Sequence, residues 1–78
     1  MVNYFGALNE EQKDQVVNRF EYHEVTTADI ERMRMLRERA VELAAAIMVL
    51  APDGREKSLA LTNLEQTLFW ANAGISRA

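Results

Sequence analysis

Two apolar repeats, separated by a single proline, constrain the fold of this chain more than any other feature. On each side of Pro52, apolar residues recur at alternating steps of three and four. This spacing places each series along one face of an α-helix, in the manner of a heptad seam. The first series is Met33, Leu36, Ala40, Leu43, Ile47 and Leu50, and the second is Leu61, Leu64, Leu68, Ala71 and Ile75.

The ends of the predicted helices are marked by local signals. Pro52 biases the residue before it away from helix, and Gly54 follows closely, so the two long helices are expected to be antiparallel neighbours joined by a short turn. Capping-box patterns are expected at Asn9 with Gln12, at Thr26 with Asp29 and at Asp53 with Glu56. The sequence therefore predicts an all-α fold with helices over residues 10–20, 28–50 and 54–76 and a hinge over residues 21–26.

The size of the chain limits how these helices can be stabilised. Its 78 residues allow one domain, residues 1–78, whose core would supply only about 3–5 kcal/mol. Disulfides are excluded because there is no cysteine, and one histidine without thiols argues against a structural zinc site. Association between copies is the remaining way to stabilise so small a domain.

Apolar residues that lie off the two seams support this view. They would stay exposed in a lone hairpin, and an apolar patch of that size indicates a partner surface. A short N-terminal helix packed beside an antiparallel two-helix hairpin, assembled as a symmetric homo-oligomer, is the predicted architecture. The residues concerned are Met35, Val41, Ala45, Met48, Val49, Leu59, Phe69 and Trp70.

Composition argues against several classes of function. The formal net charge of −3 is unusual for a general DNA or RNA binder. No signal peptide is visible, and the longest apolar run, residues 43–51, is far shorter than the roughly 20 residues of a membrane span. The chain shows no catalytic triad, no thiol nucleophile and no glycine-rich phosphate loop. We expect no catalytic residue, no metal site, no cofactor and no enzymatic activity.

Arginine is the one enriched chemical group. Four arginines occupy a short stretch of the second predicted helix: Arg32, Arg34, Arg37 and Arg39. Guanidinium forks suit carboxylate and phosphate oxygens. The simpler interpretation is a solvated helix face on which these arginines pair with Glu31, Glu38 and Glu42. The sequence leaves both interpretations open.

Aromatic and polar residues near the hinge have similar alternatives. Tyr22 could anchor the loop under Phe20, or it could offer a face on which a nucleobase stacks. His23 is by default a structural hydrogen-bonding group. Trp70 is expected in the core or at an interface, and Asn72 could fix the register of an oligomer.

The C-terminal part of the chain carries a more specific pattern. It reads Arg55-Glu56-Lys57-Ser58-Leu59-Ala60-Leu61-Thr62, then Leu64-Glu65, then Phe69-Trp70-Ala71-Asn72-Ala73, and ends with Ile75-Ser76-Arg77, while Tyr22-His23 and Arg32-x-x-x-Leu36-Arg37 stand upstream. Over about residues 8–77 the chain resembles the phage anti-CBASS sponges, short helical-hairpin proteins that sequester the cyclic oligonucleotide messengers of a bacterial defence system. One departure bears on ligand preference: Glu24-Val25-Thr26-Thr27 stands where relatives have prolines and a lysine.

The resemblance implies a homohexamer in the host bacterial cytoplasm that binds its ligand without cleaving it and so prevents activation of CBASS effectors. Cyclic dinucleotides such as cGAMP would lie at dimer interfaces, with Tyr22 on the base and Arg37 on the phosphate. His23 and Arg34 are the neighbouring candidates for these two roles. Cyclic trinucleotides would use separate pockets, to which Arg77 is the expected contributor.

Two other classes of function remain open from the residues alone. A small oligomeric module or inhibitor could bind a host protein through its apolar helix faces. A purely structural oligomer in a phage particle is the third interpretation.

Overall fold

The computed structural model describes residues 3–78 and consists of helices joined by short connections. A 3-10 helix, η1 (Phe5–Ala7), precedes three α-helices: α1 (Glu10–Phe20), α2 (Thr27–Leu50) and α3 (Arg55–Arg77). The described part of the chain contains no strand. The predicted all-α class and the three helices are confirmed, with each end within one residue of its expected position. Residues 1 and 2, which the predicted domain includes, lie outside the described part.

Two of the three predicted capping boxes form. At the start of α1, the Asn9 side chain accepts from the Gln12 backbone N–H at 2.8 Å, and Gln12 Oε1 accepts from the Asn9 N–H at 3.1 Å. Thr26 and Asp29 make the same reciprocal pair at the start of α2, both at 3.1 Å. Each box satisfies two backbone donors that the first helical turn would otherwise leave free.

The third capping box, Asp53 with Glu56, is wrong. Gly54 is the residue before α3, with φ 151°, and no side chain caps this end. Asp53 instead accepts from Lys57 Nζ at 3.0 Å, and the same ammonium donates to the Met48 carbonyl at 2.8 Å. Lys57 thus ties the last turn of α2 to the first turn of α3, which draws the Asp53 carboxylate away from the capping position.

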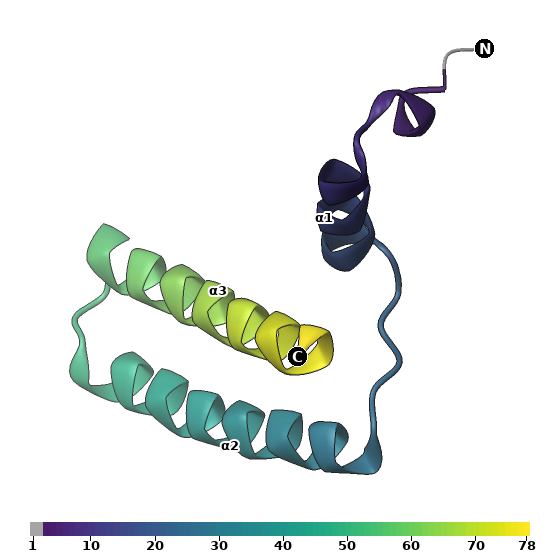
Figure 1. The fold of residues 1–78 in the computed structure, drawn as a ribbon. Coiled ribbons are helices and arrows are strands. Elements are labelled where there is room, and N and C mark those ends of the chain that lie inside the picture. The colour runs from purple at the N-terminus through teal and green to yellow at the C-terminus, as the bar shows by residue number, and fades with distance from the viewer. Residues whose placement is uncertain (1–2) are drawn as a thin grey trace.

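The two long helices lie side by side and antiparallel, as the heptad seams predict (Figure 1). The first helix, α1, stands apart from α2, near the C-terminal end of α3, and a long extended linker connects it to α2 (Figure 1). Among residues 3–78, one hydrogen bond joins α1 to the hairpin: Arg77 Nη2 donates to the Arg19 carbonyl at 2.9 Å. The packed unit is therefore the hairpin, with α1 as an appendage.

A single chain does not make a closed core. No side chain among the described residues is fully buried. The accessible surface is 6695 Å², whereas a compact monomer of this mass would expose about 4,800 Å². The radius of gyration is 17.7 Å, against about 11.5 Å for a compact domain of this length.

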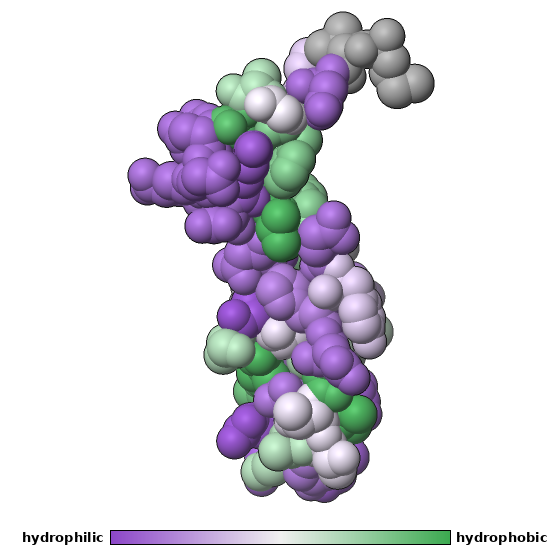
Figure 2. Space-filling model, turned by 45° about the vertical axis from the view of Figure 1, so that its right-hand side comes forward, coloured by the Kyte–Doolittle hydropathy of each residue, from purple (hydrophilic) through white to green (hydrophobic). Residues whose placement is uncertain are grey.

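Part of the exposed surface is apolar. Separate patches of hydrophobic residues lie between larger hydrophilic areas on the face shown in Figure 2. Val49 and Leu50, at the end of α2, are each 81% exposed. The off-seam residues named above are also exposed, and so are the seam residues Leu36 and Leu43. No helix among residues 3–78 is both long and apolar enough to cross a membrane.

Candidate ligand site

The hinge between α1 and α2 carries the first two candidate residues. Tyr22 is 86% exposed and Phe20 is 80% exposed, so Tyr22 is not held under Phe20 within one chain. An exposed phenol on an extended linker has its aromatic face free for a partner. Whether that partner is a nucleobase or protein, the ring is not part of this chain's own packing.

His23 has a defined structural contact. Its Nε2 lies 2.6 Å from the Asn18 carbonyl, and because a carbonyl can only accept, Nε2 carries the proton. The neighbouring Arg19 carbonyl accepts from Arg77. Both carbonyls belong to the last turn of α1, where backbone acceptors lack partners within the helix and positive groups are favoured. The simpler role that the sequence suggested for His23, a structural hydrogen bond, is therefore present.

Three of the four arginines on α2 are satisfied by carboxylates on the same helix. Arg32 pairs with Asp29 at 3.2 Å and Arg39 pairs with Glu42 at 3.2 Å. Arg34 contacts both Glu31, at 2.5 Å, and Glu38. This is the solvated, self-paired face that the sequence offered as the simpler interpretation.

The pairing of Arg34 with its carboxylates shifts the pKa values of both Glu31 and Arg34. Hydrogen bonding from Arg34 lowers the pKa of Glu31 below its usual range. The same interaction, with Glu38 adding to it, raises the pKa of the Arg34 guanidinium. A phosphate approaching Arg34 would have to compete with two carboxylates, so this arginine is the weaker of the two phosphate candidates.

Arg37 differs from its neighbours. Within the part of the chain that the structure describes, its guanidinium makes no salt bridge and no hydrogen bond. Its side chain instead lines one end of a groove of about 280 Å³ between α2 and α3. The other lining residues are Ala40, Val41, Ala44, Leu61, Leu64, Glu65 and Leu68.

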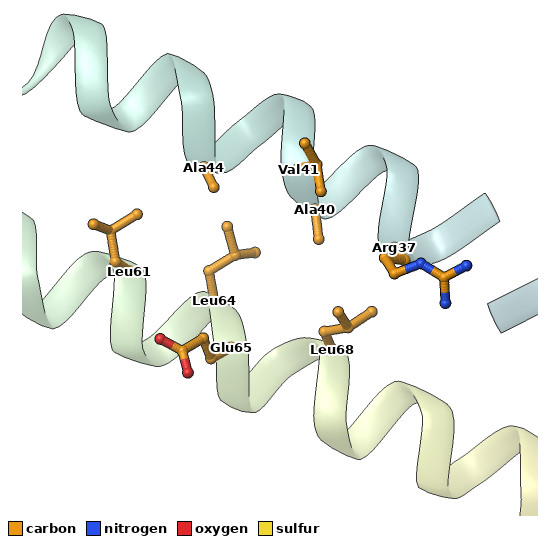
Figure 3. A pocket seen from close by; sticks show the side chains of 8 residues that line it. All are labelled: Arg37, Ala40, Val41, Ala44, Leu61, Leu64, Glu65 and Leu68. Atoms are coloured by element: carbon orange, nitrogen blue, oxygen red, sulfur yellow. The ribbon is translucent and has the colours of Figure 1, made fainter. Parts of the chain in front are cut away.

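The close view of this groove shows its chemistry (Figure 3). Apolar side chains of α2 and α3 form the walls, and the Arg37 guanidinium points out at one end. Glu65 lies on α3, and its carboxylate points away from Arg37, with Leu68 between them (Figure 3). The groove can therefore hold an apolar surface while presenting a cation at its end. We call it the Arg37 groove.

The structure does not bring Tyr22 and Arg37 together within one chain. Tyr22 precedes α2, while Arg37 lies ten residues beyond Thr27, which corresponds to about 15 Å along the helix axis. The groove that Arg37 lines does not include Tyr22. In the single chain, therefore, the two side chains do not share one groove.

Arg77 lies in a second concave region. Its cleft, of about 660 Å³, lies between the end of α1 and the end of α3 and is lined by Arg19, Phe20, Phe69, Trp70 and Arg77. Phe69 and Trp70 stand edge to face, with ring centroids 5.7 Å apart. Sequence reasoning assigned Trp70 to packing and missed Arg19 and Phe20 here. The sequence did contain a signal: Arg19 directly precedes Phe20, and Arg77 lies seven residues, about two helical turns, after Trp70.

The acidic residues and the histidine do not form a metal site. Among residues 3–78, no three of these side chains converge closely enough to hold an ion. The available groups are cationic and aromatic: guanidinium groups line the Arg37 groove and the Arg77 cleft, and exposed rings line the cleft. A small helical-hairpin protein with these features is suited to binding an anionic, base-containing ligand.

Comparison with known proteins gives the same class. Residues 12–76 match the family described as Acb2/Tad1, hairpin domain, and the chain belongs to that family. This is the anti-CBASS sponge family, so the resemblance noted in the sequence is confirmed. The family function is binding of cyclic oligonucleotides, and the family consists of ligand-sequestering sponges rather than enzymes. No match is found among curated proteins or among solved structures.

Proposed function

We propose that this protein is a phage anti-defence sponge that binds cyclic dinucleotides such as cGAMP, and cyclic trinucleotides at a second site, without cleaving them. By lowering the free concentration of the messenger in the host cytoplasm, it prevents CBASS effectors from being activated. The observation that carries this proposal is the combination of family membership over residues 12–76 with one unpaired arginine, Arg37, at the mouth of a groove.

The dinucleotide site is assigned to an interface between copies. A cyclic dinucleotide has two bases and two phosphates in approximate two-fold symmetry, and a two-fold interface offers each protein group twice. Tyr22 supplies the stacking surface and Arg37 the phosphate contact, with His23 and Arg34 as the neighbouring groups. Two chains can supply together the two groups that do not line a common groove in one chain.

The energies are sufficient for useful affinity. Two stacking contacts contribute about 1–3 kcal/mol each, and two charge-assisted phosphate contacts contribute about 1.5–3 kcal/mol each. The gross total of about 5–12 kcal/mol must also cover the loss of freedom on binding. A rigid, preassembled oligomer keeps that cost low, and a hexamer is the assembly that we propose.

The trinucleotide site is assigned to the Arg77 cleft. Arg77 and Arg19 place two guanidinium groups beside Phe20, Phe69 and Trp70. Rings and arginines in one cleft offer both stacking and phosphate contacts. Arg77 is already held in position by its hydrogen bond to Arg19.

Calorimetry of the purified protein against a panel of cyclic di- and trinucleotides tests the proposal. We expect saturable binding to at least one cyclic dinucleotide and recovery of intact nucleotide after the protein is denatured. Recovery of a linear product would show cleavage and contradict a sponge. Binding to none of the panel would favour the alternative that the exposed apolar faces support, a small oligomeric module or inhibitor that binds a protein.

A further inference from the structure

The short helix α1 exposes an apolar face in the single chain. Lys13, Val16, Val17 and Phe20 share one face, at helical spacings of three, one and three. Val16, Val17 and Phe20 are all exposed in the single chain. A helix of 11 residues is marginal on its own, because isolated helices shorter than about 12–15 residues are barely stable in water. The apolar face of α1 therefore needs a surface to cover it.

The linker gives α1 the freedom to reach such a surface. Residues 21–26 contain no helix or strand, and six extended residues span at most about 20 Å. The hydrogen bond from Arg77 to the Arg19 carbonyl is the one that joins α1 to its own hairpin among residues 3–78. Packing within the chain does not fix α1 against the hairpin.

The Arg37 groove can hold the apolar face of α1. From Leu61 to Leu68 the groove follows seven residues of α3, about 10 Å. The apolar residues of α1, from Val16 to Phe20, follow four residues, about 6 Å, and so fit within that length. Alanines at positions 40 and 44 leave room in the groove wall for bulky residues of an entering helix.

We propose that α1 of one chain docks into the Arg37 groove of a second copy, with its C-terminal end at Arg37. This arrangement places Tyr22, two residues after Phe20, beside the second copy's Arg37. The inference rests on the proposed cyclic dinucleotide site and names the element that assembles it. It also explains why the two residues are far apart within one chain.

Electrostatics favours this direction of docking. The C-terminal end of a helix carries partial negative charge, which is stabilised by a nearby cation. Arg37 is the arginine of α2 that has no carboxylate partner in the described chain. The N-terminal turn of α1, with Glu10 and Glu11, would then lie at the far end of the groove, away from Arg37. The reverse direction would place those two carboxylates beside Arg37 and carry Tyr22 away from it.

Cross-linking between two different chains tests the docking directly, because the native chain has no cysteine. Chains with Val17→Cys and chains with Val41→Cys are coexpressed and treated with a short bismaleimide. We expect a cross-linked pair containing one chain of each kind. Glu42→Cys is the matched control: it neighbours Val41 in sequence but is absent from the groove lining, and it should give little heterodimer. Equal yields from Val41→Cys and Glu42→Cys would overturn the proposal.

A double variant, Val17→Cys with Val41→Cys in one chain, separates docking within a chain from docking between chains. We expect a product of twice the monomer mass or more on a denaturing gel. Cross-linking that joins the two cysteines of one chain would show that α1 folds back on its own hairpin, and it would overturn the inference.

Ligand affinity gives the second readout. Phe20→Ser removes the largest apolar contact of α1 and should weaken cyclic dinucleotide binding by about tenfold or more. Gln15→Ala, on the opposite face of α1, should leave the affinity unchanged. If the native protein binds but Phe20→Ser binds equally well, the docking is wrong and the sponge function stands. If the native protein binds no cyclic dinucleotide, the function itself fails, and the cross-links still decide the docking.

Discussion

The N-terminal half of α2, residues 27–39, and its C-terminal half, residues 40–50, meet solvent in different ways. The first half is rich in charge, and its carboxylates and guanidinium groups pair along the helix, as Arg32 does with Asp29 and Arg34 does with Glu31. Exposed pairs of this kind contribute little stability, about 0–1 kcal/mol each. They do leave the surface polar and, apart from Arg37, pair the arginines of this half without another chain.

The second half has almost no polar side chain. Residues 43–51 are all apolar, yet Met48, Val49 and Leu50 are exposed in the single chain. Covering a large apolar side chain contributes about 1.5–3 kcal/mol. Here α3 covers one side, and the other sides stay exposed in the single chain.

The contrast gives each half a different role. The charged half pairs most of its charged groups within one chain, whereas the apolar half leaves much of its surface uncovered. Arg37 lies near the boundary and belongs to neither pattern, because it is charged but unpaired and lines an apolar groove. In the assembly that we propose, a charged group left free at this edge is well placed to meet a ligand held between copies.

The largest expected effect comes from comparing a new charge in the apolar half with a reversed charge in the charged half. Met48→Glu should disrupt assembly or folding, because an unpaired charge in a desolvated helix contact costs several kcal/mol. Glu31→Lys, in the charged half, should leave the assembly intact. Light scattering gives the mass of each variant, and we expect the native protein and Glu31→Lys to be larger than a dimer. Ala45→Glu should behave as Met48→Glu does.

Two results would contradict this interpretation. A native mass near 8.9 kDa at micromolar concentration would mean that the apolar half stays exposed. Normal assembly of both Met48→Glu and Ala45→Glu would mean that copies meet through another surface.

The fold could be predicted because its signals are local and periodic. Two capping boxes place the starts of α1 and α2, Pro52 places the turn between α2 and α3, and the heptad spacing predicts that these two helices pair. The failure at Asp53 has a physical cause: Lys57 reaches both Asp53 and the Met48 carbonyl across the turn. This geometry exists only once the hairpin has formed, and it outcompetes the local capping pattern.

The candidate site was less predictable for the same reason. The sequence shows four arginines with glutamates at suitable spacing, but it does not say which pairs form, and only the structure separates the paired Arg34 from the unpaired Arg37. The hydrogen bond from Arg77 to Arg19 joins residues 58 positions apart. No periodicity within the chain encodes such a contact.

A second test compares these two arginines. Arg37→Ala should weaken cyclic dinucleotide binding by about 1.5–3 kcal/mol per contact and make binding less dependent on salt. Arg34→Ala should have a smaller effect, because its guanidinium is already shared by Glu31 and Glu38. Calorimetry at two salt concentrations, with light scattering to confirm the assembly, measures both. Equal losses for the two variants would show that pairing within α2 does not decide which arginine meets the phosphate.

The smallest expected effect is a loss of helix stability at the start of α2 at low pH. Hydrogen bonding from the Thr26 backbone is the main cause that lowers the pKa of Asp29 below its ordinary value of 3.8, and Arg32 adds to it. The pKa of Glu31 is likewise below its ordinary value of 4.5. Because these pKa values are lower in the folded chain, the two carboxylates stabilise the fold fully above their ordinary pKa values. That contribution is lost as the pH falls through the lower, folded values.

Acidification below about pH 4 should therefore loosen the start of α2 first. Residues 43–50 contain no titratable side chain, so the apolar half should respond only if the whole assembly comes apart. Helical chemical shifts measured by NMR for residues 27–32 and 43–50 across the titration distinguish the two halves. In Asp29→Asn the acid-dependent change at residues 27–32 should be smaller, because one of the two carboxylates no longer titrates. Simultaneous loss of helix in both halves would mean that the charged half is not an independent unit and that its stability depends on the same contacts between copies.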